Sequence, residues 1–190
     1  MRTTTELRGE ILTAARAEFA RCGLAGARID RIATSARASK ERLYAHFGDK
    51  ETLFREVALA DAAEFFESVP MAPEDVAEYA AGVYDLACRR PEHLRMLTWA
   101  RLEGFVLPAP DAASHPVPEL VVTAIEAAQA DGRVDPNWKP EDLIVLLFGV
   151  GLAWAHLPDD IAGTDDPEVI ASRRAVVIEA ARRIIAKPGG

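Results

Sequence analysis

Apolar residues recur every three or four positions along most of the chain, which is the spacing of one face of an α-helix. The first segment carries apolar residues four apart: Leu7, Ile11, Ala15 and Phe19. They predict a helix over about residues 4–21, which Gly23 and Gly26 would end. No run of alternating apolar and polar residues is long enough to predict a sheet. We therefore expect an all-helical (all-α) protein.

Two short helices joined by a three-residue turn are predicted next. Ile29, Ile32 and Ala33 share one helix face, and Leu43 and Phe47 share a face of the second helix. Ala36-Arg37-Ala38 interrupts the apolar pattern, and the hydroxyl of Ser39 can then cap the second helix. The other faces of that helix carry hydrogen-bond donors: Lys40, Arg42, Tyr44 and His46. This arrangement is typical of a helix-turn-helix, whose second helix enters the major groove of DNA.

The remaining helices are marked by their starting residues. Asp49 can cap a fourth helix that extends to near Pro70. Beyond it, Pro-Glu pairs indicate helix starts, because proline lacks the amide proton that would be unpaired there and glutamate faces the positive end of the helix dipole. The pairs are Pro73-Glu74, Pro91-Glu92, Pro118-Glu119, Pro140-Glu141 and Pro167-Glu168. We expect nine helices in total, with loops at residues 107–116 and around Asp159-Asp160 and Asp165-Asp166.

The charge is divided unevenly along the 190 residues. The formal net charge of -8 argues against a protein that binds nucleic acid over its whole surface. Residues 1–50, however, hold ten Lys and Arg against six Asp and Glu, whereas residues 51–190 hold twelve against twenty-four. A basic amino-terminal part on an acidic remainder favours DNA contact through one end only.

The sequence gives little support for catalysis, metal binding or membrane insertion. It has no Gly-x-Ser-x-Gly, phosphate-binding glycine loop or His-Glu-x-x-His, and its four histidines are scattered. Cys22 and Cys88 lack metal-ligand spacing. The longest apolar run, residues 143–155, is shorter than the roughly 20 residues that a membrane span needs. We expect no catalytic residues, no metal, no cofactor and no membrane contact, in a cytoplasmic protein without a signal peptide.

The helix-turn-helix segment resembles the tetracycline-repressor (TetR/AcrR) family of bacterial transcriptional regulators. The matching positions are Ile32-Ala33, the turn Ala36-Arg37-Ala38-Ser39-Lys40, Leu43-Tyr44-Ala45-His46-Phe47 and Asp49-Lys50-Glu51-Thr52-Leu53, about a quarter of the chain. The resemblance implies an amino-terminal three-helix DNA-binding domain over residues 1–50. It also implies a carboxy-terminal helical domain over residues 51–190 that binds an effector and dimerises, and nine helices are the usual count of this family.

The predicted DNA contacts are basic or polar residues of the first domain: Arg28, Arg37, Ser39, Lys40, Arg42, Tyr44, His46 and Lys50. The alternative is that they are ordinary solvated surface residues. Three positions depart from the family pattern. Arg37 replaces a turn glycine, and a positive φ there would cost about 1–2 kcal/mol. Ala27 and Arg28 stand in place of a Thr or Ser cap, and Glu41 stands where glycine is common, so that it would either accept a hydrogen bond from cytosine or repel phosphate.

Two further sets of residues are implied for the second domain. Candidates for an effector pocket are mostly aromatic: Tyr79, Tyr84, His93, Met96, Trp99, Phe105 and Trp154. Plain core packing is the alternative for each of them. Residues 143–157 form a segment that is apolar all round and must be buried on several sides, against a second subunit or within one subunit. The candidate interface consists of Leu143, Leu147, Val150, Trp154, Val176, Val177, Ala180 and Ile184.

The sequence therefore predicts a homodimeric, DNA-binding transcriptional regulator that is released from a palindromic operator by a small, largely apolar effector. Two alternatives stay open. One is a helical ligand-binding or scaffold protein that has lost operator binding, and the other is a helical enzyme, which would need a convergent acid/base cluster.

Overall fold

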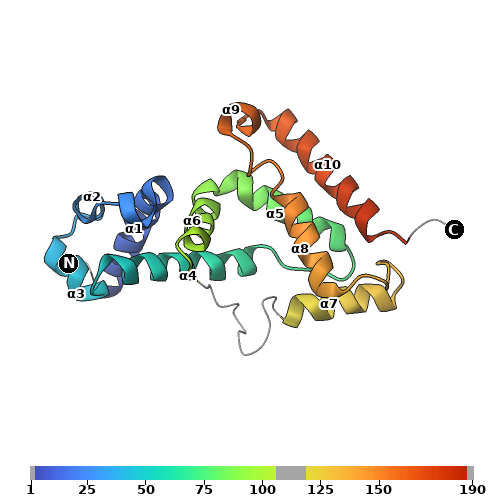
Figure 1. Ribbon diagram of the computed structural model, residues 1–190, viewed down its shortest axis with the longest axis horizontal. Coiled ribbons are helices and arrows are strands. Elements are labelled where there is room, and N and C mark those ends of the chain that lie inside the picture. Colours follow the sequence, from blue (N-terminus) through green and yellow to red (C-terminus); the bar gives the residue numbers. More distant parts are fainter. Residues whose placement is uncertain (1–2, 106–118, 188–190) are drawn as a thin grey trace. The chain divides into compact units, whose positions relative to one another are not determined.

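The computed structural model describes residues 3–105 and 119–187, and all regular secondary structure within these ranges is helical (Figure 1). The all-helical prediction is confirmed. The described residues form ten helices: α1 (Thr4–Gly26), α2 (Ile29–Ser35), α3 (Lys40–Phe47), α4 (Lys50–Ser68), α5 (Val76–Arg89), α6 (Pro91–Leu102), α7 (Glu119–Ala130), α8 (Pro140–Gly151), α9 (Asp159–Ala162) and α10 (Pro167–Ile185). The tenth is the four-residue α9, where a loop was expected. The predicted loop at residues 107–116 lies outside the described ranges.

Helix starts were predicted well where a capping residue or proline stands directly at the first turn. Ser39 accepts a hydrogen bond from the Arg42 N–H at 3.3 Å, and Asp49 accepts one from the Thr52 N–H at 2.7 Å. Pro91, Pro140 and Pro167 occupy first helical positions, as predicted. The prediction of a helix start at Pro73-Glu74 is wrong, because α5 begins at Val76. The pair lies in a turn, a position that proline also suits.

The chain forms two compact units: unit 1 comprises residues 1–64 and 90–108, and unit 2 comprises residues 65–89 and 109–190. Each unit is held by its own helix contacts. In unit 1, α1 packs against α2 and α6, and α2 packs against α3. In unit 2, α5 packs against α8 and α10, and α8 also contacts α7 and α10. The functional boundary predicted after residue 50 remains a prediction.

The core of unit 1 contains aromatic and aliphatic side chains from α1, α3, α4 and α6. Phe19 and Phe54 are fully buried and meet edge to face, with ring centroids 5.0 Å apart. Leu43 and Phe47 of α3 belong to the same core. Burial of these two side chains fixes which face of α3 points inward, and therefore which residues point outward.

In unit 1, α1 bends at Gly23, where φ is +66° and the backbone leaves the helical conformation. The Trp99 ring of α6 lies directly over this glycine, and a Cβ there would come within 2.9 Å of the ring. The Trp99 Nε1–H also donates to the Ala20 carbonyl at 3.2 Å. The expected end of the first helix near residue 21 is thus a kink, and the helix continues to Gly26.

Close approach of α5 and α8 shapes unit 2. A Cβ on Gly151 would lie 2.7 Å from the Ala80 carbonyl oxygen and 2.6 Å from the Val83 Cβ, so only glycine fits there. The carboxylates of Glu78 and Asp85 on α5 pair with Arg174 of α10 at 2.7 and 3.0 Å. The apolar segment expected to form one helix through residue 157 leaves the helix after Gly151 and continues in turns.

Candidate nucleic-acid interface

The outward face of α3 is the candidate DNA-reading surface. Leu43 and Phe47 are buried and His46 is half-buried, and the other five positions of this eight-residue helix are exposed. Arg42 is exposed, and Tyr44 retains 44% of its surface. The Ser39 cap holds the first turn of α3 in place. A short helix anchored on one face and carrying long donor side chains on the other has the form required to enter a major groove.

The structure places the eight predicted DNA contacts in two groups. Six are exposed: Arg28, Arg37, Ser39, Lys40, Arg42 and Tyr44. His46 and Lys50 are half-buried. The Lys50 ammonium lies 3.5 Å from the Ala25 carbonyl oxygen and 3.4 Å from that of Ala27, where it supports the end of α1. Lys40 pairs with Asp30 of α2. Both lysines therefore have partners within unit 1 that a phosphate would have to share or replace.

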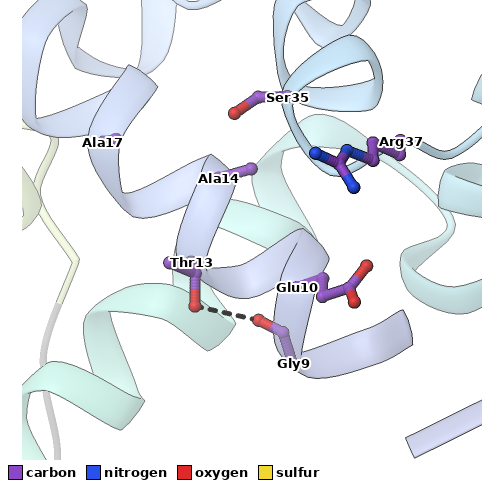
Figure 2. Close-up of a pocket in the computed structure, with 7 residues that line it drawn as sticks. All are labelled: Gly9, Glu10, Thr13, Ala14, Ala17, Ser35 and Arg37. Carbon is purple, nitrogen blue, oxygen red and sulfur yellow. Dashed lines mark hydrogen bonds between the residues drawn. The ribbon is translucent and has the colours of Figure 1, made fainter. Parts of the chain in front are cut away.

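The turn between α2 and α3 contains a strained residue. Arg37 has a φ of +49°, the left-handed conformation that the missing turn glycine would adopt freely. The strain of about 1–2 kcal/mol anticipated for this position therefore applies. Figure 2 shows Arg37 and Ser35 across a groove from α1, with the Glu10 carboxylate and the Arg37 guanidinium at its rim. The Thr13 hydroxyl on α1 is turned to the Gly9 carbonyl, at 3.1 Å.

A side chain of α1 replaces the missing cap of α2. Arg28 occupies the cap position and makes no side-chain cap hydrogen bond. The buried Glu18 carboxylate accepts a hydrogen bond from the Arg28 N–H at 3.2 Å and also binds Arg21. Burial alone would raise the pKa of Glu18, but these hydrogen bonds and the charges of Arg21 and Arg31 lower it overall. An ionised carboxylate is thus held at the positive end of α2, as a capping residue would hold it.

Glu41 has a local role in α3. Hydrogen bonds from its own backbone N–H and from the Ser39 side chain lower the pKa of its carboxyl. The carboxylate therefore faces the first turn of α3, where it suits the helix dipole. Because it is engaged in this way, it does not need a cytosine partner to be accommodated.

The predicted effector residues are divided between the two units. Tyr79, Tyr84 and Trp154 belong to unit 2, and His93, Met96, Trp99 and Phe105 belong to unit 1. In unit 1, Met96 is fully buried in the apolar core, and Trp99 and Phe105 pack against it. These three therefore match the core-packing alternative. In unit 2, Tyr84 and Trp154 meet edge to face with centroids 5.8 Å apart, and Arg173 lies over the Trp154 ring at 5.7 Å.

The predicted dimer residues need a correction. Leu143, Leu147 and Val177 are buried inside unit 2, because α8 and α10 turn these side chains toward α5, α7 and each other. They are core residues and are not available to a partner. Val176 is 54% exposed, and Ala180, Ile184, Val150 and Trp154 are half-buried. Sequence reasoning missed the most exposed apolar side chains of α8: Val145 at 64% and Leu146 at 42%.

Two protein-family models match the chain, and both describe tetracycline-repressor-like proteins. The model of bacterial regulatory proteins of the tetR family matches residues 11–57, and the tetracyclin repressor-like C-terminal domain matches residues 75–183. The HTH-type transcriptional repressor SCO4008 of Streptomyces coelicolor is 34% identical over 188 residues, which cover 94% of each chain. The HTH-type transcriptional repressor AcnR of Corynebacterium glutamicum is 43% identical over 65 residues, 34% of this chain and 35% of its own.

Comparison with solved structures gives the same result as comparison with sequences. The crystal structure of the regulator SCO4942 from Streptomyces coelicolor has a TM-score of 0.78 and 36% identity, and it covers 95% of this chain and 99% of its own. The regulator HI0893 from Haemophilus influenzae has a TM-score of 0.71 at 20% identity, with 98% and 100% coverage, which shows the fold alone. In the part of the chain that the structure describes, no helix is both long and apolar enough to span a membrane. The chain belongs to the tetR family of bacterial regulatory proteins, which are DNA-binding transcriptional regulators and not enzymes.

Proposed function

We propose that this protein is a repressor that binds a palindromic operator as a homodimer and leaves it when a small, largely apolar effector binds. The single observation that carries the proposal is the outward face of α3, where Arg42 and Tyr44 are exposed while Leu43 and Phe47 anchor the helix. A rigid helix with long donor side chains on its free face fits base edges and flanking phosphates. The excess of Lys and Arg over Asp and Glu in residues 1–50 adds the electrostatic attraction.

The homodimer is supported by the apolar outer face of unit 2. On α8, Val145, Leu146 and Gly149 lie at neighbouring positions of one face, all exposed, and α10 contributes Val176. The two helices pack against each other, and each carries exposed apolar residues. A Cβ on Gly149 would meet nothing within 4 Å, which leaves room for a close helix from a second subunit. A two-fold axis would then present two α3 helices to successive major grooves.

The effector proposal rests on the aromatic cluster of unit 2. Tyr79 and Tyr84 are buried, and burial raises the pKa of each hydroxyl to about 12, so both stay protonated near neutral pH. Tyr84 packs against Trp154, beside Arg173. Apolar rings with a few polar groups suit a small, mostly apolar molecule. An effector that binds best to a conformation in which the two α3 helices of the dimer are wrongly spaced for the operator would weaken operator binding. The expected coupling free energy between the effector site and the DNA site is about 1–3 kcal/mol.

Removal of the Arg42 side chain is the direct test of operator binding. We expect Arg42→Ala to weaken binding of the full-length protein to DNA from upstream of its own gene by about 10- to 100-fold, because a base or phosphate contact is lost. The measurement is fluorescence anisotropy with a labelled duplex over a salt series. Tyr44→Ala should weaken binding in the same direction, and both variants should keep the helical circular dichroism of the parent.

Arg89→Ala is the matched control, since Arg89 is an exposed arginine of α5 outside the proposed DNA surface. Its operator affinity should equal that of the parent. If Arg42→Ala and Arg89→Ala bind DNA equally well, the α3 face does not read the operator.

An arginine placed on the outer face of α8 should separate the subunits. Leu146→Arg would bury an unpaired charge in the proposed interface, and we expect the dimer dissociation constant to rise by more than about 100-fold. The mass in solution, measured by light scattering after size-exclusion chromatography, should fall to that of one chain. The control is Leu120→Arg on α7, whose leucine is 77% exposed in the same unit and should leave the dimer intact. A dimer that survives Leu146→Arg would place the interface elsewhere.

A further inference from the structure

Unit 1 contains a cluster of metal-ligating side chains that the DNA-binding function does not use. Asp61 and Glu64 lie three residues apart on α4, and His93 lies in the first turn of α6. One ligand atom from each of the three lies within 4.8 Å of the other two. Asp61 is completely buried, His93 is 7% exposed, and Glu64 is half-buried. These three side chains therefore form a cluster that is largely shielded from solvent.

The spacing of the ligand atoms is close to that around a small divalent cation. The His93 Nδ1 lies 3.8 Å from the Asp61 Oδ1 and 3.6 Å from the Glu64 Oε2. These distances are too long for hydrogen bonds. Ligands at about 2.0–2.2 Å from a tetrahedral Zn²⁺ are about 3.4 Å from one another. The two separations from the His93 Nδ1 exceed this value by a few tenths of an ångström, and all three ligand atoms lie within 4.8 Å of one another, so the side chains must move closer to surround one ion.

A second observation points to a missing ligand at the same place. The Asp61 Oδ2 is buried and has no hydrogen-bond partner among the described residues. The other oxygen, Oδ1, accepts a hydrogen bond from the Arg16 Nε at 2.6 Å. A buried carboxylate oxygen without a partner is costly, and a cation bound by both oxygens of the Asp61 carboxylate would satisfy it.

Two arginines reach the same carboxylates and would compete with a cation. Arg16 of α1 pairs with Asp61 and lies 3.9 Å from Glu64, and Arg90 pairs with Glu64. Arg90 is exposed, lies directly before α6 and pairs with the other Glu64 oxygen, Oε1, so that its positive charge opposes a cation at Oε2.

We propose that Asp61, Glu64 and His93 form a binding site for a divalent transition-metal ion, with Zn²⁺ as the best fit. One imidazole nitrogen and two carboxylate oxygens suit borderline ions better than Mg²⁺ or Ca²⁺, which prefer oxygen alone, or Cu(I), which prefers sulfur. Three protein ligands leave a fourth position for water or a further ligand. The proposal concerns unit 1 alone and does not depend on operator binding or on the effector of unit 2.

The test is Zn²⁺ binding by full-length protein that has been treated with a chelator, measured by competition with a chromophoric chelator. Cys22→Ser and Cys88→Ser are introduced in every variant so that thiolates do not hold the metal. We expect one tightly bound Zn²⁺ per chain. Since loss of groups that merely support a ligand already lowers affinity 10- to 100-fold, His93→Gln and Glu64→Gln should each weaken binding by at least about 100-fold.

Two further variants separate a real site from a folding effect. Arg90→Ala removes the competitor for Glu64 and should tighten Zn²⁺ binding several-fold, a gain that damage to the fold would not produce. His156→Gln alters an exposed histidine of unit 2 and should leave the affinity unchanged. The proposal is overturned if the protein takes up no stoichiometric Zn²⁺, if His93→Gln and Glu64→Gln bind it like the parent, or if His156→Gln weakens binding as strongly as they do.

Discussion

Gly23→Ala should destabilise the protein by about 2–6 kcal/mol. At φ +66° and ψ -177° the backbone is in a region that essentially only glycine adopts, and a residue with a Cβ there costs about 1–3 kcal/mol. The new methyl group would also meet the Trp99 ring at 2.9 Å, and overpacking of this kind typically adds about 1–3 kcal/mol. The Trp99 ring cannot simply withdraw, because its Nε1–H is hydrogen-bonded to the Ala20 carbonyl. Urea unfolding followed by circular dichroism, at one fixed protein concentration, measures the change.

Gly48→Ala separates the two contributions. Gly48 has a φ of +76° and open space around the position of a Cβ, so its substitution introduces backbone strain without a clash. With ψ at -63°, the conformation is a strained one for a residue with a Cβ, and the substitution should cost about 1–3 kcal/mol, less than Gly23→Ala. Equal losses for the two variants would show that the packing of Trp99 on the α1 kink contributes nothing to stability.

Local signals in the sequence predicted most of the fold. Ser39 and Asp49 cap helices as expected, and three of the Pro-Glu pairs stand at helix starts, because capping depends only on residues within one turn. Pro73-Glu74 failed because proline fits a turn as well as a first helical turn. The short α9 was missed because a single turn of helix has no apolar period to detect.

Within the candidate DNA surface, the sequence predicted which face of α3 is free, since Leu43 and Phe47 define the buried side at helical spacing. It also anticipated strain at Arg37, whose φ is positive. It did not predict that Lys50 would lie against backbone carbonyls, or that Glu18 would accept a hydrogen bond from the backbone at the start of α2. Both contacts join residues that are ten or more positions apart and depend on how the helices pack.

Tertiary packing also decides the two features that sequence reasoning could not resolve. All faces of α8 are apolar, so the pattern alone does not distinguish Leu143 and Leu147, which face the core, from Val145 and Leu146, which face outward. Similarly, His93 is separated by about thirty positions from Asp61 and Glu64, and no spacing rule connects them. The i, i+3 spacing of the two acids on one helix face was the only signal in the sequence.

Phe54→Ala should destabilise the protein by about 3–5 kcal/mol, the usual range for removing a fully buried phenylalanine. Phe54 of α4 contacts Phe19 of α1 at a centroid distance of 5.0 Å and Phe105 at 5.3 Å. Its ring therefore joins α1, α4 and the segment after α6 in one core, and its loss would leave a cavity that these helices cannot close without moving. The free energy of unfolding in urea measures the effect.

Two controls set the scale for Phe54→Ala. Phe54→Leu keeps most of the apolar volume and should cost clearly less, because the cavity is smaller. Leu102→Ala changes a leucine of unit 1 that is 67% exposed, and such surface substitutions usually stay within about 0.5 kcal/mol. If Phe54→Ala cost no more than Leu102→Ala, the three-ring contact would not be what holds α1 to α4. The position of α3 on this same core, through Leu43 and Phe47, would then have no rigid support.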